Sequence, residues 1–107
     1  TVVEPEAAPA LHDAIQAGQI ISAKGPVSSM GRLDCKEASM IALNGLARDA
    51  DHFVLLCDDE VEDVMPVLAN LGLATTPSGG AGLAAALLGK VDLPSDARIL
   101  VILSEEA

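Results

Sequence analysis

The feature that most constrains this chain is a set of short, uninterrupted apolar runs separated by amphipathic stretches. Residues 53–57 (FVLLC) and 99–103 (ILVIL) contain no polar side chain. Runs of this length without alternation are typical of strands covered on both faces. Residues 1–3 and 20–23 are shorter, rich in β-branched side chains, and predicted as strands as well.

The stretches between these runs carry helix signals. The predicted helices cover residues 7–17, residues 39–50, a stretch from the cap at Asp58 and Asp59 to residue 71, and residues 83–88. Gly18 is expected to close the first helix and Ser39 to cap the second. Asp59 and Glu62 have the spacing of a capping box at the start of the third, which Pro66 should kink. Strands and helices are therefore predicted to alternate about four times.

Buried strands joined by helices predict a sheet whose strands run parallel, with helices on both faces. We therefore expect an α/β three-layer sandwich with a mostly parallel sheet, formed as a single domain over residues 1–107. Half of the residues are apolar and 21% are charged, which excludes disorder. Phe53 is the only aromatic residue, so the core must be aliphatic.

The net charge and the cysteine spacing restrict which classes of partner and which kinds of site are expected. Six basic against 16 acidic residues give a net charge of −10, which repels nucleic acid and an anionic membrane surface. The sequence has neither an apolar run long enough to span a membrane nor a signal-peptide pattern, so a cytoplasmic protein is expected. Cys35 and Cys57 with His12 and His52 lack metal-ligand spacing, so no metal site is predicted.

Residues 75–82 (TTPSGGAG) form the most informative local pattern. Glycines let a backbone approach a ligand closely, and the start of the following helix offers free N–H groups to an anion or cofactor. The same small residues also permit tight packing of a helix entrance, and both interpretations stay open. The pattern matches neither a Walker A loop nor a dinucleotide-binding fingerprint.

Other candidate residues lie where predicted strands end. Ser104 follows the last strand at its carboxyl end, where ligands of α/β sheets gather, although serine there is also a common turn former. Glu4 and Glu6 end the first strand and could do acid–base work, with a solvated acidic corner as the simpler interpretation. The polar loop 28–37, which contains Gly31, is long enough to line a site.

Four motifs occur in order along the chain, at residues 2–6 (VVEPE), 31–37 (GRLDCKE), 75–82 (TTPSGGAG) and 102–105 (ILSE). Together they resemble the C-terminal part of the fold-type II pyridoxal-phosphate enzymes. This is the tryptophan synthase β-like family, which includes the serine/threonine dehydratases, and the diaminopropionate ammonia-lyase group is the most similar. The resemblance covers essentially the whole chain.

The resemblance implies roles for four residues in binding pyridoxal 5'-phosphate. Ser104 matches the hydroxyl that hydrogen-bonds the pyridine nitrogen, a neutral partner that suits β-elimination. Gly31 matches the glycine loop near the cofactor ring. Pro77 and Ser78 would border the pocket, with Pro77 standing where some relatives have a glutamate. Glu105 stands where the family usually continues with glycine.

The resemblance also implies what this chain lacks. The family's Schiff-base lysine and phosphate loop belong to an upstream segment, and Lys24, Lys36 and Lys90 do not have that lysine's context. We therefore expect a C-terminal domain of an amino-acid lyase that forms one wall of the cofactor site. It would hold no catalytic residue, would be inactive alone, and would work with the remainder of the parent enzyme on an amino-acid substrate.

A sheet taken from a larger domain exposes an edge and an apolar face, so self-association into a homo-oligomer is expected. Two other functions stay open. The first is a free-standing small-anion-binding or regulatory α/β module that uses residues 75–82. The second is a purely structural subunit that assembles on a partner.

Overall fold

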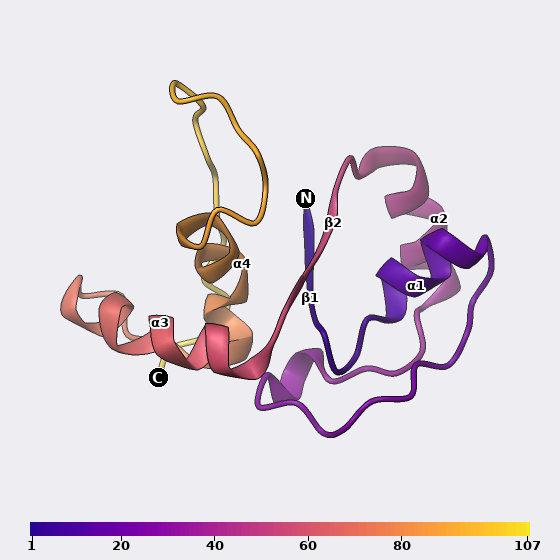
Figure 1. Ribbon diagram of the computed structural model, residues 1–107, viewed down its shortest axis with the longest axis horizontal. Helices are drawn as coiled ribbons and strands as arrows, with labels where there is room; N and C mark the ends of the chain where they lie inside the picture. The colour runs from indigo at the N-terminus through magenta and orange to yellow at the C-terminus, as the bar shows by residue number, and fades with distance from the viewer.

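The computed structural model describes residues 1–107 as a two-stranded parallel sheet with helices on both sides (Figure 1). The elements are β1 Val2–Pro5, α1 Ala10–Ala17, the 3-10 helix η1 Gly31–Leu33, α2 Met40–Asp49, β2 Phe53–Leu56, α3 Asp58–Asn70 and α4 Pro77–Leu87. In the sheet Val2 lies opposite Phe53, and Pro5 lies opposite Leu56. Figure 1 shows α1 and α2 on one side of the strands and α3 and α4 on the other. The α/β class and the parallel sheet are as predicted.

The main core lies where β2, α3, α4 and η1 meet. Eight buried residues form one cluster: Met30, Leu56, Val61, Val64, Leu68, Ala81, Ala84 and Ala85. Alanines on α4 let that helix approach α3 closely, and Leu68 fills the space between the two helices at full burial. No aromatic side chain takes part, because Phe53 is only half-buried.

The helix ends show which local signals were correct. Gly18 closes α1 in the left-handed conformation (φ 72°), and the Ser39 hydroxyl accepts a hydrogen bond from the Ala42 N–H, as predicted. The capping box of α3 is different from the one expected. It joins Cys57 and Glu60 rather than Asp59 and Glu62, because the N-cap of α3 is Cys57, two residues before Asp59, and the helix begins at Asp58. Helix α3 continues through Pro66 to Asn70.

Two of the four predicted strands are absent. Residues 20–23 have no regular secondary structure, and only the Ala23 N–H donates to another backbone group, at 2.7 Å to the Lys36 carbonyl. Residues 99–103 make no backbone–backbone hydrogen bond at all. A strand requires a neighbour that takes its N–H and C=O groups, and neither segment has one. Apolar composition alone therefore predicted more strands than the sheet contains.

Residues 99–103 run beside α4 with one face uncovered. A side chain built at Gly82 of α4 would meet Val101 Cγ1 at 3.5 Å, which places the segment against this helix. The alternate residues Leu100 and Ile102 remain 91% and 77% exposed. None of the helices combines the length and the apolar character that a membrane span requires.

Candidate functional site

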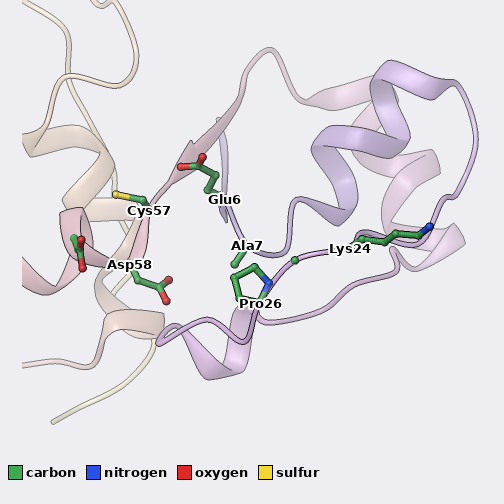
Figure 2. Close-up of a pocket in the computed structure, with 8 residues that line it drawn as sticks. Glu6, Ala7, Lys24, Pro26, Cys57 and Asp58 are labelled. Carbon is green, nitrogen blue, oxygen red and sulfur yellow. The ribbon is translucent and has the colours of Figure 1, made fainter.

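A cavity of about 420 Å³ opens at the carboxyl ends of both strands (Figure 2). It is lined by Glu6, Ala7, Lys24, Gly25, Pro26, Cys57, Asp58 and Asp59. Asp58 is already engaged, since it accepts hydrogen bonds from the Ser28 hydroxyl at 2.6 Å and the Ser29 N–H at 2.7 Å. Figure 2 shows the Lys24 side chain directed away from the carboxylates. None of the four cofactor-binding residues expected from the sequence lines this cavity.

Those four residues belong to segments that meet around the start of α4. Thr76 caps this helix by accepting from the Gly79 N–H at 3.0 Å, and Pro77 occupies its first turn. The Ser78 hydroxyl accepts from the Arg32 N–H at 3.0 Å. This bond ties η1, which begins at Gly31, to α4. Gly31 and Ser78, far apart in the chain, are thus brought to one place by folding.

The C-terminal segment joins the same place through Glu105. The Thr75 hydroxyl donates to the Glu105 carbonyl at 2.6 Å, and the Thr76 hydroxyl donates to the Glu105 carboxylate. Arg32 Nε lies 3.2 Å from the other carboxylate oxygen. Sequence reasoning noted Glu105 only as a departure from the family pattern. No local signal indicated that it would connect η1, α4 and the C-terminal segment.

Ser104 itself faces a different hollow. Its side chain is exposed and borders a space of about 350 Å³ with residues 72–74, Leu103, Glu105 and Glu106. Gly31, Pro77 and Ser78 do not line that space. Within this chain Ser104 is therefore linked to the other predicted residues through its neighbour Glu105.

The glycines of residues 75–82 pack against the protein's own atoms. A Cβ at Gly79 would come within 2.7 Å of Thr75 Oγ1 and 2.8 Å of Glu105 Cβ. A Cβ at Gly80 would come within 2.8 Å of Thr75 Cγ2 and 2.9 Å of Met65 Cε. Of the two interpretations left open by the sequence, tight packing accounts for both glycines. The first turn of α4 also already faces an anion, the Glu105 carboxylate.

Glu4 has a role that sequence reasoning missed. Its carboxylate accepts from the N–H groups of Leu11 at 2.9 Å and His12 at 2.7 Å. It thereby caps α1, whose own N-cap residue, Pro9, provides no side-chain bond. The expected solvated acidic corner is therefore wrong for Glu4, which is half-buried, whereas Glu6 is exposed. The turn between β1 and α1 creates this contact, and no spacing rule predicts it.

The lysines are the only side-chain amines that could hold an aldehyde cofactor, and two of them have partners within the chain. Lys36 Nζ donates to the Ala7 carbonyl at 2.8 Å, the Pro26 carbonyl at 2.7 Å and Asp34 at 2.6 Å. The hydrogen bond from Lys36 lowers the pKa of the Asp34 carboxyl below its ordinary value. Lys90 pairs with Glu60 at 2.6 Å. None of the lysines lines the hollow beside Ser104.

The Lys90 pair also affects the start of α3. The hydrogen bond from Lys90, with a second from the Cys57 N–H, lowers the pKa of Glu60.

Cys35 and Cys57 are free thiols. No three His, Cys, Asp or Glu side chains form a group that could hold a metal ion.

Solved structures of other proteins share this fold. The threonine deaminase of T.th. superposes with a TM-score of 0.76 and 22% identity, over 86% of this chain and 34% of that protein. Maize serine racemase gives a TM-score of 0.71 and 27% identity, over 78% of this chain and 26% of that protein. The chain thus spans about a third or less of the length of these two proteins. No curated protein matches the sequence.

The match to a protein family extends over nearly the whole chain. The family described as pyridoxal-phosphate dependent enzyme matches residues 1–105, which include all four motifs identified in the sequence. Both structural neighbours have the fold-type II architecture, with a parallel sheet between helices. The chain therefore belongs to the pyridoxal-phosphate-dependent enzymes of fold type II.

Proposed function

We propose that this chain is the C-terminal part of a pyridoxal-phosphate-dependent amino-acid lyase, an ammonia-lyase or dehydratase, and forms one wall of its cofactor site. The family match over residues 1–105 is the observation that carries this proposal. The likeness to threonine deaminase supports a β-eliminating reaction, because deamination of a hydroxy amino acid requires removal of the α-proton and loss of the β-hydroxyl group. The serine racemase likeness is compatible with the same cofactor on the same fold.

The residues of this chain fit one side of such a site. Ser104 offers an exposed hydroxyl beside a hollow, and a hydroxyl can hydrogen-bond a ring nitrogen without carrying a charge. When bound, the cofactor supplies the electron sink for an amino-acid substrate. Ser104 would orient the ring and leave its nitrogen unprotonated, while Gly31, Pro77 and Ser78 would contribute to the wall through the η1–α4 junction.

Two requirements of the chemistry are not met by this chain's residues. The amine that holds the cofactor aldehyde would have to lie across the ring from Ser104. Lys36 and Lys90 are engaged elsewhere, and Lys24 lines the cavity beside Glu6 and Asp58, which does not include Ser104. The space beside Gly79, where a phosphate could have been bound, is occupied by atoms of Thr75 and Glu105. We therefore propose that the amine and the phosphate site come from the remainder of a larger enzyme, and that the chain alone has no activity.

A cofactor-trapping experiment tests this division of roles. The chain is incubated with pyridoxal phosphate, reduced with borohydride, and its lysines are mapped by mass spectrometry. No lysine should be labelled stoichiometrically, and an amino-acid substrate should release no ammonia. Stoichiometric labelling of Lys24, Lys36 or Lys90 would show that the chain holds its own aldehyde-binding amine.

The natural full-length protein provides the positive test. It should bind pyridoxal phosphate, and Ser104→Ala should weaken that binding, because the ring nitrogen loses its partner. Ser95→Ala, at an exposed loop position, is the matched control and should leave the affinity unchanged. Failure of the wild-type full-length protein to bind the cofactor would refute the proposed function.

The alternative of a free-standing anion-binding module is less well supported. Its proposed site was the turn at residues 75–82, where helix N–H groups would receive the anion. In the structure the Gly79 N–H donates to Thr76, and the Glu105 carboxylate lies against the same turn. An external anion would have to displace a charge that belongs to the protein.

A further inference from the structure

Regular structure does not fix the position of Ser104. The preceding residues 99–103 form no backbone ladder, and Leu100 and Ile102 project from one face with little cover. A hydroxyl that orients a cofactor ring must nevertheless be held within a fraction of an ångström of its productive place. Within this chain, another contact must therefore restrain the end that carries Ser104.

Glu105 makes that contact at both its backbone and its side chain. Its carbonyl accepts from Thr75, a residue that is only 9% exposed, and its carboxylate accepts from Thr76. Thr76 uses the same hydroxyl oxygen to accept from the Gly79 N–H, so one side chain caps α4 and holds Glu105. Backbone and carboxylate are thus both fixed to the first turn of α4.

The absence of a side chain at Gly79 makes this approach possible. A Cβ there would lie 2.8 Å from Glu105 Cβ and 2.9 Å from the Glu105 nitrogen, closer than real Cβ atoms come. A carboxylate near a helix N-terminus is also favoured by the helix dipole. Arg32 adds an ion pair, but its side chain is 82% exposed, so we expect little energy from it.

We propose that Glu105 is a positioning residue, which holds the Ser104 hydroxyl in place for the cofactor by anchoring the backbone to Thr75 and Thr76. Because Glu105 directly follows Ser104, fixing its carbonyl and carboxylate restricts the backbone on which the serine is carried. This inference rests on the proposed function, and extends it to a residue that would not touch the cofactor.

The test is a double-mutant cycle in the natural full-length protein, with pyridoxal phosphate as the probe. Affinity and the absorption band of the bound cofactor are measured for wild type, Ser104→Ala, Glu105→Ala and the double variant. Ser104→Ala should weaken binding about three- to tenfold, as expected for one neutral hydrogen bond. Glu105→Ala should give a similar loss and the same spectral change, and the double variant should be no worse than Ser104→Ala alone.

Three further variants sharpen the cycle. Glu105→Gln keeps an acceptor for Thr76 and should stay close to wild type. Thr75→Val keeps the buried volume but removes the donor to the Glu105 carbonyl, so it should reproduce the loss and decides the question if Glu105→Ala does not fold. Asp63→Ala removes an exposed carboxylate without a partner on α3 and should change nothing.

The outcomes separate this inference from the proposed function. If wild type takes up no cofactor, both fail. If wild type and Ser104→Ala behave as expected but the losses from Ser104→Ala and Glu105→Ala simply add, Glu105 contributes only general stability and the positioning role is overturned. A Glu105→Ala variant with wild-type affinity and spectrum would overturn it as well.

Discussion

One helix contains two glycines whose replacement by alanine should have opposite effects on stability. At Gly79 the added methyl group would meet Thr75 Oγ1 at 2.7 Å and the Glu105 nitrogen at 2.9 Å. Neither atom is the end of a long flexible side chain, so the helix start or the C-terminal segment must shift. At Gly82 the methyl group would meet only Val101 Cγ1, at an ordinary 3.5 Å.

The magnitudes follow from these distances. Replacing glycine by alanine inside a helix gains about 1 kcal/mol, whereas overpacking a filled site costs about 1–3 kcal/mol. Gly82→Ala should therefore raise the free energy of unfolding by up to about 1 kcal/mol. For Gly79→Ala the cost should exceed the gain, which is smaller in the first turn, and the net loss should be about 1–2 kcal/mol.

Urea unfolding followed by far-ultraviolet circular dichroism measures both variants against wild type. The chemical change is identical and both sites lie on α4, so helix propensity alone predicts two changes of the same sign. A Gly79→Ala variant as stable as Gly82→Ala would refute the conclusion that Gly79 is required for close packing against Thr75 and Glu105.

Three other changes probe the electrostatics and the exposed surface. Lys36→Met should lower the free energy of unfolding by at least about 1 kcal/mol, since two backbone carbonyls lose their charged donor, whereas Lys24→Met should have little effect by urea unfolding. Lys90→Met should raise the pKa of Glu60 toward its ordinary value in an NMR titration. Because the pKa of Glu60 is lower in the folded state than in the unfolded state, its ionised form stabilises the fold at a pH above the unfolded-state pKa. This stabilisation is lost as the pH falls through the folded-state pKa. The Lys90→Met variant should therefore lose less stability on acidification than wild type. Leu100→Lys should reduce self-association in light scattering, and a wild-type chain that stays monomeric at high concentration would contradict the proposed homo-oligomer.

Local signals predicted the helices better than the strands, for a physical reason. Helix bonds close within the segment, so Ser39 and Gly18 could mark ends without knowledge of the rest of the fold. A strand is completed by its neighbour. Residues 53–56 pair with β1, whereas the equally apolar residues 99–103 have no strand partner. Nothing within either apolar run distinguishes the two cases.

The candidate site shows the same limit. The sequence pointed to Gly31, Ser78 and Ser104, and folding does bring their segments together, but through Arg32 and Glu105. A glycine can make room either for a ligand or for close packing, and the atoms next to its Cα decide which. For Gly79 some of these atoms belong to Glu105, near the C-terminal end of the chain. Such contacts are set by topology and lie beyond any local pattern.

The exposed apolar surface bears on how the chain would function. Leu100 and Ile102 project from a segment whose backbone groups are unpaired, and this segment borders the same hollow as Thr1 and Val3 of the β1 side. β1 has only one strand neighbour, so its other edge is also open. A strand inserted there could satisfy β1 and residues 99–103 together and cover their apolar side chains. The segment that lacks a strand partner is also the one that ends in Ser104, so the open edge and the candidate site meet at the same place.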